Sequence, residues 1–140
     1  MLVVPYRPEH LTLMRVQPAQ AYMRPFIEVG DYADALAASP AYTGMIGEQP
    51  VVCAGIILQW EGRAFAWALV SEDCCAHLFA ATRAVARFLA LRDERRIETT
   101  VRSDFAEGAR WARMLGFERE GKMRAYSPDG RDYDLYARIR

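Results

Sequence analysis

The chain of 140 residues is long enough to enclose one hydrophobic core, so residues 1–140 are expected to form a single domain. Its 18 Lys and Arg residues balance 18 Asp and Glu residues, which gives no indication of binding to nucleic acid or to an anionic membrane. The uncharged run 49–60 is too short to cross a bilayer, and three cysteines do not form a disulfide framework. We therefore expect a cytoplasmic protein with reduced thiols.

The first forty residues predict little regular structure. Leu2 to Val4 is a candidate edge strand, and prolines at positions 5, 8, 18 and 25 then leave room for one or two helical turns at most. The apolar spacing from Phe26 to Ala38 predicts a helix with a weak point at Gly30. Ser39-Pro40 ends this helix, because the residue before a proline avoids the α region.

Three strands are predicted next, at 42–46, 51–59 and 64–70, and the short turn-like segments between them make neighbouring strands antiparallel. The third strand has no polar side chain, which predicts that both of its faces are covered. An amphipathic helix from about 73 to 91 follows. Because this helix connects strand 64–70 to a β-branched strand at 96–101, the two strands should be parallel and the sheet mixed.

The last third of the chain predicts a helix and a hairpin. Ser103-Asp104 followed by Glu107 has the spacing of a capping box, and Gly116 is the expected C-terminal glycine of the helix. A strand within 117–126, a turn at 127–130 and a final strand complete the chain. Alternation in that final strand places Tyr136 on its wetter face.

This order of elements resembles the GNAT superfamily of N-acetyltransferases from about Tyr42 to the C-terminus, and its most specific segment is the helix 110–117 ending in Leu-Gly-Phe. The resemblance implies a single-domain α/β fold, with a mixed, mostly antiparallel twisted sheet, a parallel splayed strand pair and helices on both faces. Shorter segments are similar to phage and prophage proteins of this fold, such as the short internal virion proteins of podophages. These segments are Pro5–Leu11, His77, 96–98 and 108–111.

The resemblance to the GNAT superfamily also implies acetyl-CoA as cofactor and transfer of its acyl group to an amine, on a small molecule or on a protein. Its thioester oxygen would face backbone N–H groups at the end of strand 64–70, and its pyrophosphate would lie at the amino end of the crossover helix. The residues implied in cofactor binding are Leu69, Val70, Ser71, Cys75 and Ala76.

The sequence departs from the superfamily pattern in two places. The phosphate loop of the superfamily is rich in glycine, whereas 71–78 contains none and carries Glu72 and Asp73, which would repel a pyrophosphate. The tyrosine that often donates the proton to the leaving thiolate is replaced by Ala112. An alanine has no proton to donate, so both departures lower the expectation of conventional acetyl transfer.

The candidate catalytic residues are His77, a base near the proposed site, and Tyr126, an acid or acceptor-binding group beside the terminal hairpin. Surface exposure of His77 and packing of Tyr126 are the alternative interpretations. Cys74 and Cys75 are expected to pack or to cap a helix, and no metal site is indicated. Glu98 is expected to face solvent, and arginines of the crossover helix are expected to pair with Asp93 and Glu94 or to meet an acidic partner.

Two function hypotheses remain open at this level. The first is an acyltransferase that moves an acyl group from acyl-CoA to an amine, with a degenerate pyrophosphate loop. The second is a catalytically inactive GNAT fold that serves as a phage or prophage virion or assembly component, with phage structural proteins as partners. Neither hypothesis fixes the oligomeric state, because fold alone does not determine function.

Overall fold

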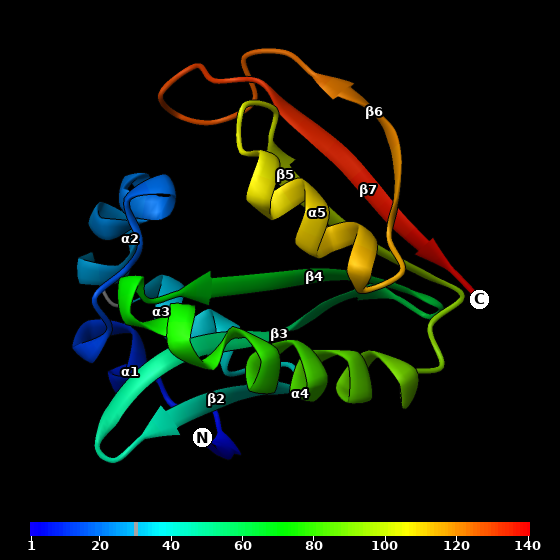
Figure 1. The fold of residues 1–140 in the computed structure, drawn as a ribbon. Helices are drawn as coiled ribbons and strands as arrows, with labels where there is room; N and C mark the ends of the chain where they lie inside the picture. Colours follow the sequence, from blue (N-terminus) through cyan, green and yellow to red (C-terminus); the bar gives the residue numbers. More distant parts are fainter. Residues whose placement is uncertain (30) are drawn as a thin grey trace. The chain divides into compact units, whose positions relative to one another are not determined.

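The computed structural model describes residues 1–29 and 31–140, which form a mixed seven-stranded sheet with helices, as predicted (Figure 1). The strand order is β1-β2-β3-β4-β5-β7-β6. The elements are β1 (Leu2–Pro5), α1 (Pro8–Leu13), the 3-10 helix η1 (Pro18–Met23), α2 (Arg24–Val29), α3 (Asp31–Leu36), β2 (Ala41–Ile46), β3 (Gln49–Trp60), β4 (Arg63–Val70), the 3-10 helix η2 (Glu72–His77), α4 (Leu78–Ala90), β5 (Arg96–Arg102), α5 (Ala106–Met114), β6 (Glu118–Met123) and β7 (Tyr133–Ile139).

The chain divides into two compact units, and strands β3 and β4 contribute residues to both. The first unit consists of Met1–Ile57 and Trp67–Leu89, and the second of Leu58–Ala66 and Ala90–Arg140. The expectation of a single domain across 1–140 is not tested by this division. Each unit is described by itself below.

In the first unit, β1 pairs with β2 and β2 pairs with β3, both antiparallel. The edge strand expected at Leu2 to Val4 and the strand pair that follows it are confirmed. No residue of β4 is exposed, as the wholly apolar run 64–70 predicts. Cys74 and Ala81 pack with Val51 and Val52 in one buried cluster.

Two predicted helices differ in detail from the structure. The helix expected over 26–38 is replaced by α2 and α3, and Gly30 lies outside the described residues. The helix expected from about 73 begins instead as the 3-10 helix η2, and the α-helix starts only at Leu78. The reason is local: Ser71 accepts hydrogen bonds from Asp73 N at its Oγ and from Cys74 N at its backbone carbonyl, and this tight turn continues as a 3-10 helix.

The second unit contains the parallel pair on which the topology depends. Arg63–Phe65 of β4 pairs with Arg96–Glu98 of β5 in parallel, as predicted from the crossover helix. Strand β7 pairs antiparallel with β5 and with β6. Gly116, at φ +90°, ends α5 in the left-handed region that glycine adopts without strain.

The placement of Tyr136 on a wet face is wrong. Its side chain is only 2% exposed, and the neighbouring Ala137 on the opposite face of β7 is buried too. Alternation with charged residues suggested a solvated face. A tyrosine ring is mainly apolar, however, and packs in a core as readily as on a surface.

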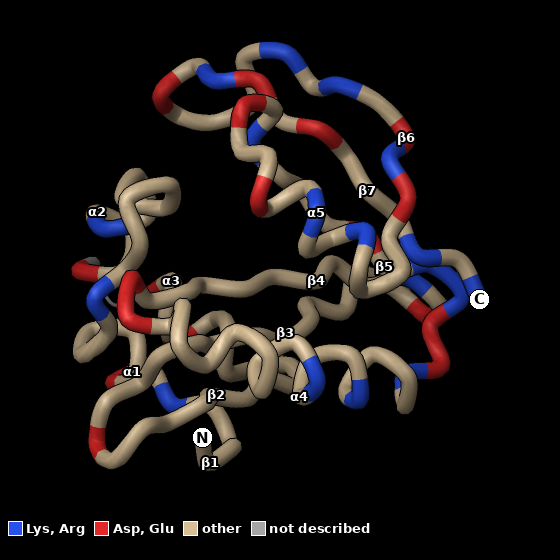
Figure 2. Tube along the Cα trace, in the orientation of Figure 1, with Lys and Arg blue, Asp and Glu red and all other residues tan. Residues whose placement is uncertain are grey.

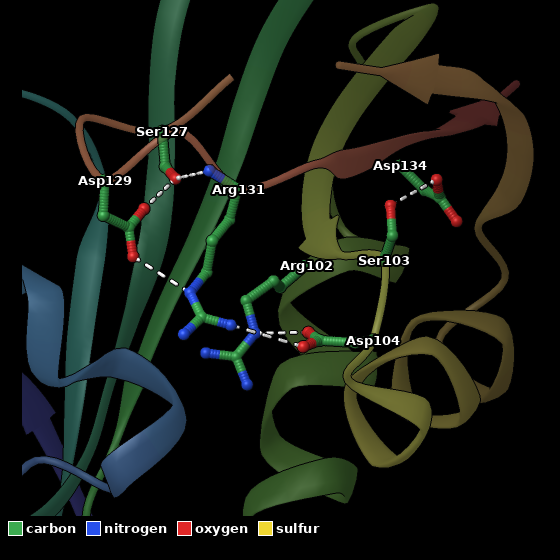
Figure 3. A network of polar contacts seen from close by, with 7 residues as sticks. All are labelled: Arg102, Ser103, Asp104, Ser127, Asp129, Arg131 and Asp134. Carbon is green, nitrogen blue, oxygen red and sulfur yellow. Dashed lines mark hydrogen bonds and ion pairs between the residues drawn. The ribbon is translucent and has the colours of Figure 1, made fainter. Parts of the chain in front are cut away.

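The predicted capping of α5 by Asp104 is also wrong. The N-cap residue is Phe105, which makes no side-chain cap, and Asp104 binds two arginines instead. Figure 3 shows Arg102 and Arg131 converging on the Asp104 carboxylate, while Arg131 also reaches Asp129. A charge-assisted bond to a guanidinium is stronger than a neutral bond to a backbone N–H, so the ion pairs take the carboxylate.

The edge strand β6 carries charges of both signs, which Figure 2 shows interspersed along its trace. Charges of this kind discourage an edge strand from pairing with other chains. Among the described helices, none has the length and apolar character needed to span a membrane.

Candidate functional site

Several backbone groups at the end of β4 have hydrogen-bond partners within the first unit. Ser71 N donates to Val51 O of β3 at 2.9 Å. Because backbone groups alternate along a strand, Ala68 and Val70 present theirs to the opposite edge. There the carboxamide of Gln20 donates from Nε2 to Ala68 O at 2.7 Å and accepts from Val70 N at 3.0 Å.

The amide groups at the amino end of η2 also have partners inside the chain. Glu72 N donates to Arg15 O at 2.9 Å, Asp73 N to Ser71 Oγ at 3.1 Å and Cys74 N to Ser71 O at 3.0 Å. These are the donors that an anion at this position would need. Each of them already makes a hydrogen bond.

Both carboxylates at this end of η2 bind the guanidinium of Arg15. Glu72 forms a short ion pair with Arg15 Nη2, and Asp73 Oδ2 lies 3.4 Å from Arg15 Nη1. The prediction that Glu72 and Asp73 occupy the amino end of this helix is confirmed. The structure adds Arg15, whose positive charge offsets theirs. Sequence reasoning missed Arg15 because it lies in the proline-rich segment, far along the chain from its partners.

The residues implied in cofactor binding fall into two groups. Leu69 and Ser71 are buried, and Val70 is partly buried, with its N–H taken by Gln20. Cys75 and Ala76 are exposed on η2. Their roles toward a cofactor remain predictions.

His77 and Tyr126, the predicted catalytic residues, lie in the first and the second unit respectively. Within the described part of the chain, the half-buried imidazole of His77 makes no hydrogen bond or ion pair that would orient it as a base. Tyr126 is 50% exposed and its ring lies 5.3 Å from that of Tyr133. Its backbone N–H donates to Arg131 O at 2.9 Å, within the loop that joins β6 to β7.

Other candidates have structural roles. Cys74 is 1% exposed and burial raises the pKa of its thiol, so the expectation that it packs is confirmed. The expectation of a solvent-facing Glu98 is wrong, because the residue is buried and its carboxylate accepts hydrogen bonds from Arg63 and Arg96. These hydrogen bonds, Arg63 foremost, lower the pKa of Glu98. Of the predicted ion pairs at the end of the crossover helix, Arg92 does bind Glu94.

A buried polar chain in the first unit had no signal in the sequence. His10 Nδ1 accepts from Arg7 N at 3.1 Å and lies 2.8 Å from Thr43 Oγ1, which is 3.4 Å from Cys53 Sγ. Burial lowers the pKa of His10 and raises the pKa of Cys53 to about 12. The described residues contain no group of three His, Cys, Asp or Glu side chains placed to hold a metal ion.

Several solved acetyltransferase structures have this fold. An N-acetyltransferase from Staphylococcus aureus Mu50 has a TM-score of 0.72 and 10% identity, over 99% of this chain and 96% of that one. A GNAT-family acetyltransferase from Bacillus anthracis gives 0.68 and 13%, over 98% and 93%. A variant of spermidine N-acetyltransferase from Vibrio cholerae gives 0.67 and 10%, over 99% and 95%. No known family profile and no curated protein sequence matches the chain. At these identities the likeness establishes the fold alone.

Proposed function

We propose that this chain, built on the fold of the GNAT acetyltransferases, binds no acyl-CoA at the end of β4 and acts as a binding or assembly component. The observation that carries the proposal is the amino end of η2, where three backbone donors have internal partners and Glu72 and Asp73 hold Arg15. A pyrophosphate at this position would meet occupied amides and two carboxylates.

The carboxylates of Glu72 and Asp73 would repel a pyrophosphate, but only modestly. A unit negative charge about 4 Å from a carboxylate is opposed by roughly 1 kcal/mol in water and by about 4 kcal/mol near a protein surface. Glu72 and Asp73 are substantially exposed, so the lower figure applies, and Arg15 offsets part of it. The occupied N–H groups therefore weigh more than the repulsion, since a phosphate cannot replace their present acceptors without breaking the turn.

Acyl transfer to an amine is the competing function. It would need a base oriented toward the amine, and the imidazole of His77 has no such orienting partner among the described residues. Ala112 is buried and offers no acid. The residues present do not fit acetyl-CoA bound in the manner of the superfamily, so no catalytic step is assigned to them.

The short segments that resemble podophage internal virion proteins, such as Pro5–Leu11, are the ground for naming a phage or prophage particle as the assembly. Peptide mass spectrometry of particles induced from the strain that encodes this chain should find the chain in constant stoichiometry with a capsid protein. Its absence from purified particles would refute the assembly part of the proposal.

A ligand titration tests the other part. A ligand at a hundred times its Kd stabilises the folded state by about 2.7 kcal/mol, which raises the melting temperature by several degrees. We expect no shift with acetyl-CoA or CoA at millimolar concentration. The double variant Glu72→Gln, Asp73→Gly is the matched comparison, because it removes both charges and restores one glycine. A shift in the unmodified chain would overturn the proposal.

A further inference from the structure

We propose that the carboxamide of Gln20 is a built-in occupant of the β4 edge at Ala68 and Val70, and that it excludes extended ligands whose successive amides would pair with this edge. This inference rests on the proposed function and extends it, because it names the side chain that occupies backbone hydrogen-bonding groups at the end of β4. The carboxamide satisfies Ala68 O and Val70 N at once, at 2.7 and 3.0 Å. One residue of an added parallel strand would make the same two hydrogen bonds.

A second glutamine fixes the orientation of this carboxamide. Gln17 Nε2 donates to Gln20 Oε1 at 3.0 Å, so that oxygen accepts from two N–H groups. With the amide turned over, its NH₂ group would face both of these donors, and its oxygen would face the carbonyl of Ala68. Only one orientation therefore satisfies the edge.

The backbone around Gln20 is held to the same strand end. Gln17 N donates to Val70 O at 2.9 Å, and Gln20 N donates to Gln17 O at 2.9 Å. Val16 forms an antiparallel bridge with Ser71. The segment 15–20 is thus continuous from the β4 edge to the amino end of η2, where Arg15 binds Glu72 and Asp73.

The chemistry of the two paired groups defines what is excluded. A ligand would have to offer an N–H to Ala68 O and a carbonyl to Val70 N. The N–H and the carbonyl of one trans amide point in opposite directions, so these two groups must come from successive amides of an extended chain. The pantetheine arm of CoA carries such amides. Neither group is available while Gln20 remains in place.

Amide hydrogen exchange measured by NMR tests the contact at single residues. In Gln20→Ala, the Val70 amide should exchange roughly five- to tenfold faster, the change expected for loss of one ordinary hydrogen bond. The Ser71 amide should keep its rate, because Val51 O remains its acceptor. The control is Gln49→Ala, which removes another side-chain bond to the amino-terminal segment, Gln49 Nε2 to Leu13 O at 2.9 Å, without touching β4. An unchanged Val70 rate in Gln20→Ala, or a joint rise of Val70 and Ser71, would overturn the assignment.

Titration with pantetheine, read from the Val70 amide chemical shift, tests the exclusion. We expect a saturable shift at millimolar pantetheine in Gln20→Ala and none in the unmodified chain or in Gln49→Ala. If the Val70 amide of Gln20→Ala exchanges faster but its chemical shift does not respond to pantetheine, the proposed exclusion of ligands by Gln20 is wrong. Binding of CoA by the unmodified chain would instead refute the proposed function, and the exchange rates would still decide the role of Gln20.

Discussion

Protonation of His10 should destabilise the folded chain in mildly acidic solution. The imidazole is 4% exposed, and its Nδ1 accepts the Arg7 N–H, so a proton on Nδ1 would face another proton. Burial first, and then the nearby Arg7 charge, lower the pKa of His10 below its ordinary value of 6.5, while Glu9 acts weakly in the other direction. The groups around the ring are otherwise uncharged: Thr43, the thiol of Cys53 and the Tyr6 ring.

The sign and the limit of the effect follow from proton linkage. Above pH 6.5 the histidine is neutral in both states and its full contribution to stability is present. As the pH falls below this value the unfolded chain takes up a proton and the folded chain resists it, so the free energy of unfolding falls until the folded pKa is reached. The slope cannot exceed about 1.4 kcal/mol per pH unit for one group. Between pH 7.5 and 5.5 the loss from this group should therefore not exceed about 1.4 kcal/mol.

Urea unfolding at these two pH values measures the loss. In His10→Asn the amide oxygen can accept the Arg7 N–H and does not titrate, so the loss should shrink to less than half. The control is His77→Asn, which removes the other histidine and should leave the loss unchanged. If His10→Asn is as acid-sensitive as the unmodified chain, or if His77→Asn abolishes the sensitivity, the reasoning from the buried Nδ1 is wrong.

Three further outcomes are expected. In urea unfolding, Gly116→Ala should lower the free energy of unfolding by about 1–2 kcal/mol, because φ is +90° and the new Cβ would lie 3.4 Å from Arg138 Nε. The control Gly121→Ala places its Cβ in open space and should be nearly neutral. Glu98→Gln should lower the free energy of unfolding by about 1–3 kcal/mol, because the partly buried guanidinium groups of Arg63 and Arg96 lose their shared carboxylate. Glu120→Gln should cost less, because among the described residues Glu120 binds only Arg96 and is more exposed. In a thiol-titration assay the exposed Cys75 should react in the folded state, and the buried Cys53 and Cys74 should react only on unfolding. Cys75→Ser should therefore remove the fast phase of the reaction. A fast phase that survives this substitution would contradict the burial of Cys53 and Cys74.

The sheet could be predicted because its signals are local. Apolar runs of strand length, separated by short turns, indicate β2, β3 and β4, and the crossover helix then requires a parallel β5. Each of these inferences uses residues close together in the chain. The structure confirms these strands and the parallel pairing of β4 with β5.

The closure of the β4 edge could not be predicted, because it depends on contacts between distant segments. Gln20 and Val70 are 50 residues apart, and Arg15 and Asp73 are 58 apart. A proline-rich segment has no periodicity that would indicate which of its polar side chains turn inward. The sequence did show which groups were missing, namely glycines in the phosphate loop and an acid at Ala112. It did not show what replaced them.

Trp67 offers a case in which deleting more atoms should cost less stability. Its side chain is 8% exposed, yet Nε1 has no hydrogen-bond acceptor among the described residues. Trp67→Phe creates a small cavity but removes a buried donor without a partner, which itself costs about 1–3 kcal/mol, so the net change in unfolding free energy should stay within about 1 kcal/mol.

The ring that packs against Trp67 supplies the matched comparison. Tyr6 lies edge-on to Trp67 at 5.5 Å, and its hydroxyl donates to Ala33 O at 2.9 Å. Tyr6→Phe removes a single oxygen atom but leaves that buried carbonyl without this donor, so it should cost about 1–2 kcal/mol in urea unfolding. If Trp67→Phe costs more than about 3 kcal/mol while Tyr6→Phe is neutral, packing of the indole outweighs the missing hydrogen bond. The presence or absence of a hydrogen-bond partner would then not predict which of these two buried residues contributes more to the free energy of unfolding.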